Sequence, residues 1–194
     1  MFPSHDPSGK AGHLRVLKSS NRNEVTMPTA DNQGSALVTN RRLDTTTRTT
    51  SGTTETDIVT GYTIEAYELT SGTGFEIPFK GQFQAANTAH TVTYRVKLGG
   101  TTILTSTAVQ AGGTTTTTFD GKIEIIGTGE QSQRVGITIN GKGTAATGSY
   151  THVVNNYGTS AIDMRQPRTL TVTAQFSAAP TTNMSVYYSS LKAV

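Results

Sequence analysis

The segment from His90 to Leu98 constrains the fold more than any other part of the chain. Its apolar side chains fall on every second residue and alternate with polar ones. In a β-strand this spacing places one set in a core and the other in water. Gly99 and Gly100 follow at once, and a Gly-Gly pair between two such strands is typical of a two-residue hairpin turn. The sequence therefore predicts an antiparallel sheet with one buried face.

The same pattern continues from about Ile58 to the C-terminus, and no segment has the periodicity of a helix. Threonine, a β-branched residue that suits a sheet with one wet face, makes up about one residue in five. Regularly spaced short strands with glycine-rich turns are typical of two-layer all-β folds. We therefore expect an all-β, jelly-roll-like β-sandwich of about eight or nine strands. The other expected strands include the residues 75–79, 101–111, 123–125, 135–139, 150–154, 170–176 and 184–188.

Two residues make specific predictions about these strands. Pro78 lacks a backbone N–H, which favours an edge strand or a bulge for the segment around it. Asn140-Gly141 is a preferred hairpin dipeptide, so the strand at 135–139 is expected to turn there.

The first 57 residues differ from the rest of the chain. They are polar, with few apolar side chains, and cannot bury enough surface to offset the entropy of ordering. We expect residues 1–57 to form a long, extended N-terminal arm that orders on a partner, and residues 58–194 to form the sandwich body. The partner-binding candidates are basic residues and an apolar anchor: Lys10, Leu14, Arg15, Val16, Leu17, Lys18, Arg22, Arg41 and Arg42.

Composition excludes several classes of function. The 194 residues contain no cysteine, which rules out disulfides and thiolate metal sites. The net charge of +3 is too small to suggest nucleic acid as a partner. No apolar run approaches the roughly eighteen residues of a membrane span, and the N-terminus lacks the layout of a secretory signal. We therefore expect neither a nucleic-acid nor a membrane partner.

The sequence contains no recognisable catalytic, cofactor or metal motif. The histidines, His5, His13, His90 and His152, are scattered, and no serine lies in a Gly-x-Ser-x-Gly elbow. Gly141-Lys142-Gly143-Thr144 resembles part of a phosphate loop but lacks the leading glycine and the following helix. We expect a protein that is not an enzyme and that needs no cofactor.

Exposed tyrosines are the candidates for sugar binding, because an aromatic face packs against the C–H surface of a sugar ring. The sequence offers Tyr150, Tyr157 and the Tyr187-Tyr188 pair, and no tryptophan. Strand alternation predicts Tyr187 on the surface and Tyr188 in the core.

Two segments of the body resemble a known family. The run from Val92 to Leu104, with Gly99-Gly100 at its centre, resembles the strand–Gly-Gly–strand hairpin of jelly-roll domains in tailed-bacteriophage structural proteins. The C-terminal part also resembles them, with Ala161-Ile162-Asp163 followed by the strand at 170–176, a turn of small residues and a last strand. The resemblance covers about residues 75–194 and leaves the arm out.

This resemblance implies a capsid decoration (cement) protein, a head fibre or a tail-associated protein, often a homotrimer. The arm favours decoration, since no heptad pattern typical of a fibre is present. We expect a virion structural protein, made in the host cytoplasm, that decorates and stabilises the outer capsid by contacting the major capsid protein. The alternatives are a receptor- or glycan-binding module of a tail fibre or adhesin, and an enzyme acting on cell-envelope polysaccharide.

Overall fold

A computed structural model describes residues 42–84, 90–110, 116–145, 148–178 and 183–194. These residues form twelve β-strands and no helix, so none of them lies in a helix that could span a membrane. The strands are β1 (Arg42–Asp44), β2 (Arg48–Thr50), β3 (Thr56–Ile64), β4 (Gly74–Gln84), β5 (Thr91–Leu98), β6 (Thr101–Thr105), β7 (Val109–Gln110), β8 (Thr116–Gly129), β9 (Ser132–Ala145), β10 (Gly148–Ser160), β11 (Arg168–Phe176) and β12 (Asn183–Ala193).

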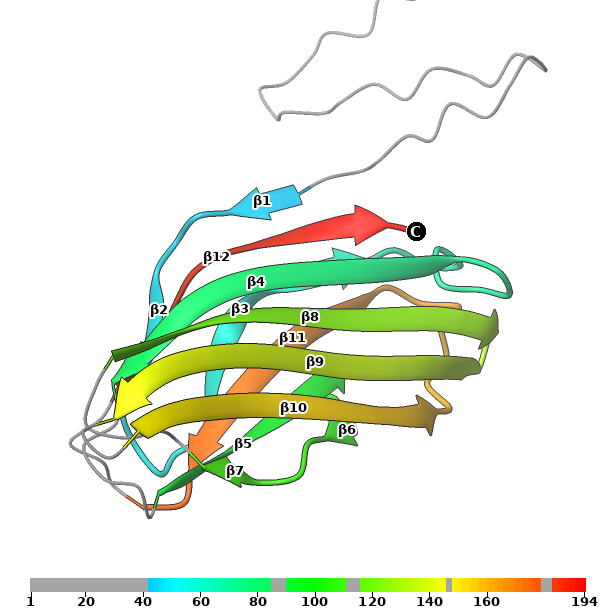
Figure 1. Ribbon diagram of the computed structural model, residues 1–194. Helices are drawn as coiled ribbons and strands as arrows, with labels where there is room; N and C mark the ends of the chain where they lie inside the picture. The colour runs from blue at the N-terminus through cyan, green and yellow to red at the C-terminus, as the bar shows by residue number, and fades with distance from the viewer. Residues whose placement is uncertain (1–41, 85–89, 111–115, 146–147, 179–182) are drawn as a thin grey trace, which may run out of the picture. The chain divides into compact units, whose positions relative to one another are not determined.

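The strands make two antiparallel sheets that pack face to face (Figure 1). The large sheet has seven strands in the order β1-β12-β4-β8-β9-β10, with β2 also paired to β12. The small sheet has five, in the order β3-β11-β5-β6, with β7 also paired to β5. This arrangement confirms the predicted all-β sandwich. The strand count exceeds the expected eight or nine because β1, β2 and β7 are two- or three-residue strands with no alternation to reveal them.

The core lies between the sheets and follows the predicted alternation. Strand β5 buries every second residue, and its Gly99-Gly100 turn has φ of 60° and 81°, the left-handed geometry of the expected hairpin turn. The largest fully buried side chains come from both layers: Tyr94, Phe79, Ile58, Ile64, Leu69, Ile77, Leu98, Ile123, Ile125, Ile137, Ile139 and Met164. Burial of this apolar surface is what holds the two sheets together.

The prediction of a turn at Asn140-Gly141 was wrong, and so was the edge-strand alternative for Pro78. The strand does not turn at Asn140-Gly141: β9 continues to Ala145 and pairs with β10 along that length. A side chain at Gly141 would come within 3.2 Å of the Phe119 Cβ atom, so this glycine permits close packing inside a strand. Pro78 lies in β4, an interior strand rather than an edge. In the β12–β4 ladder no residues pair between Ser189↔Phe79 and Lys192↔Glu76, where the proline cannot donate a hydrogen bond, and a register shift typical of a bulge lies close by, between Val186 and Tyr188.

Candidate functional site

In the structure the sandwich begins at Arg42, the first residue of β1, and not at residue 58 as the sequence predicted. Of the predicted partner-binding residues of the arm, only Arg42 is described; Lys10, Leu14, Arg15, Val16, Leu17, Lys18, Arg22 and Arg41 lie outside the described residues. Arg42 pairs with Leu191 in the large sheet, and its Nη1 donates to the Thr63 carbonyl oxygen at 3.4 Å. Residues 42–57, assigned to the arm from their composition, contain β1, β2 and the beginning of β3.

This junction attaches the chain to both sheets. Strands β1 and β2 pair with β12 of the large sheet, and β3 then pairs with β11 of the small one. Arg48 links the two layers, since its Nε donates to the Thr60 hydroxyl at 3.0 Å. A second link is buried, where the Tyr62 and Ser189 hydroxyls are 2.8 Å apart; burial raises the pKa of Tyr62. The N-terminal segment is thus joined to the body by several independent contacts.

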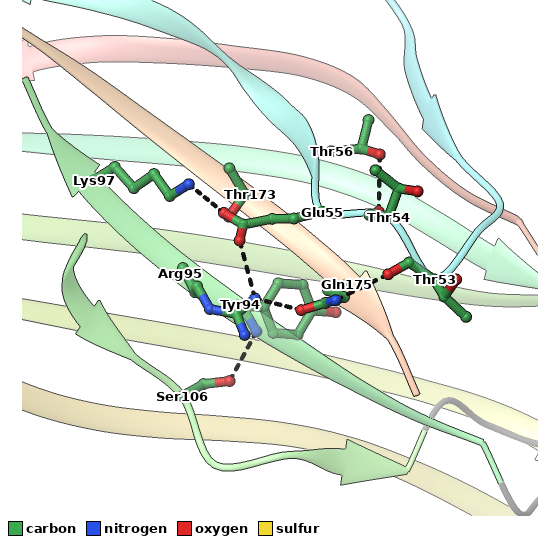
Figure 2. A network of polar contacts seen from close by, with 10 residues as sticks. All are labelled: Thr53, Thr54, Glu55, Thr56, Tyr94, Arg95, Lys97, Ser106, Thr173 and Gln175. Carbon is green, nitrogen blue, oxygen red and sulfur yellow. Dashed lines mark hydrogen bonds and ion pairs between the residues drawn. The ribbon is translucent and has the colours of Figure 1, made fainter. Parts of the chain in front are cut away.

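Glu55 fixes the same segment to the outer face of the small sheet (Figure 2). Its carboxylate accepts from Lys97 Nζ at 2.5 Å and from the Thr173 hydroxyl at 2.7 Å, and Arg95 Nη1 lies 3.4 Å away. Gln175 completes the cluster by donating its Nε2 to the Thr53 carbonyl oxygen at 2.9 Å. The hydrogen bond from Lys97 is the main reason that the pKa of Glu55 is lowered. The cluster therefore holds residues 53–55 across β11 and β5.

On the outer face of the large sheet, a hollow of about 430 Å³ opens between β8, β9 and β10. Its floor is Gly136, which pairs with Tyr157 on one side and Glu124 on the other, so the three residues form one row across the sheet. A Cβ atom on Gly136 would lie 2.8 Å from two atoms of the Tyr157 ring. The ring therefore lies over the glycine, yet the residue remains 68% exposed. The hollow is lined by Glu124, Ile126, Arg134, Val135, Gly136, Tyr157, Gly158 and Thr159.

The row continues toward β12 as a line of charges. Lys122 donates to Glu124 Oε1 at 2.6 Å and lies 3.7 Å from Glu76, and Lys192 lies 3.5 Å from the other Glu76 oxygen. The hydrogen bond to Glu124 raises the pKa of Lys122, with smaller contributions from neighbours that include Tyr157. Arg134 stands beside this row, and within the described part of the chain its guanidinium has no hydrogen bond or ion pair. The hollow thus has an unpaired cation on its wall.

Neither of the two described histidines, His90 and His152, lines this hollow. His152 is buried, and its Nε2 lies 2.9 Å from the Tyr94 hydroxyl, which makes it a core residue. The buried His90 Nδ1 has no hydrogen-bond partner among the described residues. In the described ranges no group of three His, Cys, Asp or Glu side chains is arranged to hold a metal ion. His5 and His13 lie outside the described residues, as does the side chain of Tyr150.

The tyrosine pair near the C-terminus differs from its prediction in one respect. Tyr187 is 39% exposed, as expected, but Tyr188 is only half-buried and pairs with the exposed Lys80. The register shift between Val186 and Tyr188 explains this, because a bulge moves every later side chain to the opposite face. Tyr188 therefore lies on the outer face and not in the core.

Comparisons with known proteins were made on sequence and on structure. No protein-family model matches the sequence, and no curated protein matches it. Among solved structures, the chain is similar to the lectin UEA-II, in a structure complexed with galactose. The identity is 9%, the match covers 71% of this chain and 84% of the lectin chain, and the TM-score is 0.34. A similarity of this size carries no information about ligands or function.

Proposed function

We propose that this protein is a virion structural protein of a tailed bacteriophage that decorates and stabilises the outer capsid. In this proposal the residues before β1 form an arm that binds the major capsid protein. The sandwich body contacts two other copies of the chain to form a homotrimer. The chain has no catalytic role. Support for the virion assignment comes from the sequence resemblance over residues 75–194.

The observation that carries the proposal is the junction at residues 42–57. An arm that binds a capsid can stabilise it only if the arm is firmly joined to a folded body that resists the force on it. Here β1 and β2 pair with β12, Arg48 bonds to Thr60 of β3, and Glu55 is held by three side chains of the small sheet. A force applied to the residues before β1 would have to break these contacts in both sheets before it could unfold the core.

The energetics of a repeated lattice fit such an arm. Ordering a polar segment costs entropy, so each of its residues contributes little net affinity. Many copies bound to one capsid, or three in one trimer, add their contributions because later contacts form at a high effective concentration. Lys10, Arg15, Lys18 and Arg22 would supply charge, and Leu14, Val16 and Leu17 an apolar contact.

A truncation tests the proposal, with the boundary moved to residue 41. The variant lacking residues 1–41 keeps all the strands that the structure describes, and we expect it to unfold at the same denaturant concentration as the full chain. We expect its cosedimentation with capsids that lack the protein to fall at least tenfold. A full chain with Tyr187→Ala serves as a control that should bind normally. Undiminished binding by the folded truncation would contradict the proposed role of the arm.

A receptor- or glycan-binding module of a tail fibre or adhesin is the second candidate function. One observation favours it: Tyr157, a candidate platform from the sequence, is exposed inside a hollow that also contains charged and hydroxyl side chains.

A further inference from the structure

We infer that the hollow between β8, β9 and β10 is a binding site for a saccharide that carries a carboxylate group. This inference does not depend on capsid attachment. It specifies the site and the ligand class for the glycan-binding candidate, and it holds equally for a capsid protein that displays this face to the outside.

The first step is the platform formed by Tyr157 and Gly136. A side chain at position 136 would compete with the ring, since a Cβ atom there would lie 2.8 Å from ring atoms Cδ1 and Cε1. Glycine removes that obstacle and lets the ring lie over β9 while 68% of the residue stays exposed. Ile126, which is 44% exposed, adds apolar surface to the same hollow. A sugar ring packs its C–H face on such an aromatic surface.

The second step is the set of polar groups around the platform. Arg134 offers a guanidinium with no intramolecular partner in the described ranges, and this group recognises carboxylates with two parallel hydrogen bonds. Glu124, held on one side by Lys122, can accept hydrogen bonds from sugar hydroxyls, and the Thr159 hydroxyl can donate or accept one. A few polar groups on a mainly apolar wall are typical of a small-molecule site.

The third step is the balance of charge, which selects an acidic ligand. Along the row, Lys122 is shared between Glu76 and Glu124, and Lys192 pairs with Glu76, so the two lysines compensate the charge of the two glutamates. Among the residues that line the hollow, this leaves the positive charge of Arg134 without a compensating negative charge. A carboxylate on the ligand would neutralise it. A phosphate ester would place more negative charge near Glu124, so we favour a uronic or other carboxylated sugar over a nucleotide.

The size of the hollow agrees with this ligand class. At about 430 Å³ it falls within the range of about 300–1,000 Å³ that is usual for small-molecule sites. That is room for a short saccharide and not for a folded protein surface.

Binding to the full chain tests the inference. Saturation-transfer NMR and calorimetry would use galacturonate and glucuronate oligosaccharides, with neutral galactose and glucose oligomers and AMP as comparisons. We expect an acidic oligosaccharide to bind at least tenfold more tightly than its neutral counterpart or AMP. Tighter binding of AMP, equal binding of the neutral sugar, or no binding to any acidic oligosaccharide would overturn the inference.

Three variants locate the site. Tyr157→Ala removes the platform and should weaken binding at least tenfold. Arg134→Gln should abolish the preference for the acidic sugar over the neutral one while leaving weak binding to both. Gly136→Ala should displace the Tyr157 ring and weaken binding severalfold without unfolding the protein, since the exposed ring can move. Tyr187→Ala, another exposed tyrosine in the same sheet, is the matched control and should bind as the native chain does.

The same variants separate this inference from the capsid proposal. Tyr157→Ala should still cosediment with capsids, because the arm is unchanged. Loss of capsid binding by Tyr157→Ala, with no effect on saccharide binding, would assign the hollow to a protein interface and overturn the inference. Acidic-saccharide binding that survives both Tyr157→Ala and Arg134→Gln would place the sugar elsewhere and would also overturn it.

Discussion

Replacing Gly127 by alanine is expected to destabilise the protein by about 3 kcal/mol, a large fraction of the 5–15 kcal/mol typical of a domain. Gly127 lies in β8 beneath the loop that joins β3 to β4, and a Cβ atom there would sit 2.1 Å from the Thr70 carbonyl oxygen. That oxygen belongs to the backbone and cannot rotate away. The loop is also bonded to Gly127, which donates to the Thr73 carbonyl oxygen at 2.8 Å and accepts from Gly72 N–H at 3.2 Å.

The alanine must therefore push the loop off β8, breaking two hydrogen bonds and exposing the fully buried Leu69. Urea unfolding followed by circular dichroism measures the change. Gly129→Ala is the matched control on the same strand, since its nearest contact would be an ordinary 3.8 Å from the Ser132 Cβ atom. We expect the control to change stability by less than about 0.5 kcal/mol. Equal midpoints for the two variants would show that the loop does not pack on Gly127 as described.

Replacing Phe79 by alanine is expected to cost about 3–5 kcal/mol. The Phe79 ring is fully buried in β4, packs edge-to-face against Phe119 with centroids 6.3 Å apart, and lies directly on Gly121 of the next strand. A Cβ atom on Gly121 would lie 2.1 Å from the ring, so the absent side chain of the glycine makes room for the ring. Removing the ring leaves a cavity that the surrounding strands cannot close.

A double-mutant cycle checks this pairing more directly than the single variant. Gly121→Ala alone should cost about 1–3 kcal/mol from overpacking. In the Phe79→Ala background the added methyl group enters the cavity, so its cost should fall by more than about 1 kcal/mol. Chemical denaturation of the four proteins gives the coupling. Strictly additive effects would contradict the contact between Gly121 and Phe79.

The parts of the fold that could be predicted are those in which local pattern and tertiary position agree. Strand β5 and its Gly99-Gly100 turn followed from alternation and turn chemistry alone, because both depend on neighbouring residues. Pro78 and Gly141 could not be placed this way. The hydrogen bonding of Pro78 depends on its neighbour β12, and the space around Gly141 depends on its neighbour β8. Neither neighbour can be known from the sequence, which does not give the strand order.

The boundary of the arm shows the same limit. Residues 42–57 are polar and show no alternation, so composition assigned them to the arm. They join the sandwich through backbone pairing with β12 and through side chains such as Arg48 and Glu55. Ladder pairing of this kind depends on a partner that comes about 140 residues later in the chain, which no local pattern can reveal.

The candidate site was predictable only in part. Tyr157 was named as a sugar-binding candidate because the sequence has no tryptophan and offers only a few tyrosines in its place. Gly136, Arg134 and Glu124 were not, because their meeting with Tyr157 depends on the registers of β8, β9 and β10. One feature of the sequence could have indicated the site: in a hairpin of β9 and β10, Gly136 lies directly across from Tyr157. Recognising this pair requires the correct position of the turn between β9 and β10, and the prediction from Asn140-Gly141 placed that turn too early in the chain.

The measurement that tests the central claim most directly is the copy number of this chain in purified virions, by quantitative mass spectrometry against the major capsid protein. Our account predicts a fixed, simple ratio to the capsid subunit, as expected of a lattice decoration. A handful of copies per particle would instead assign the chain to a tail, vertex or fibre. Absence from the particles would contradict the virion assignment altogether.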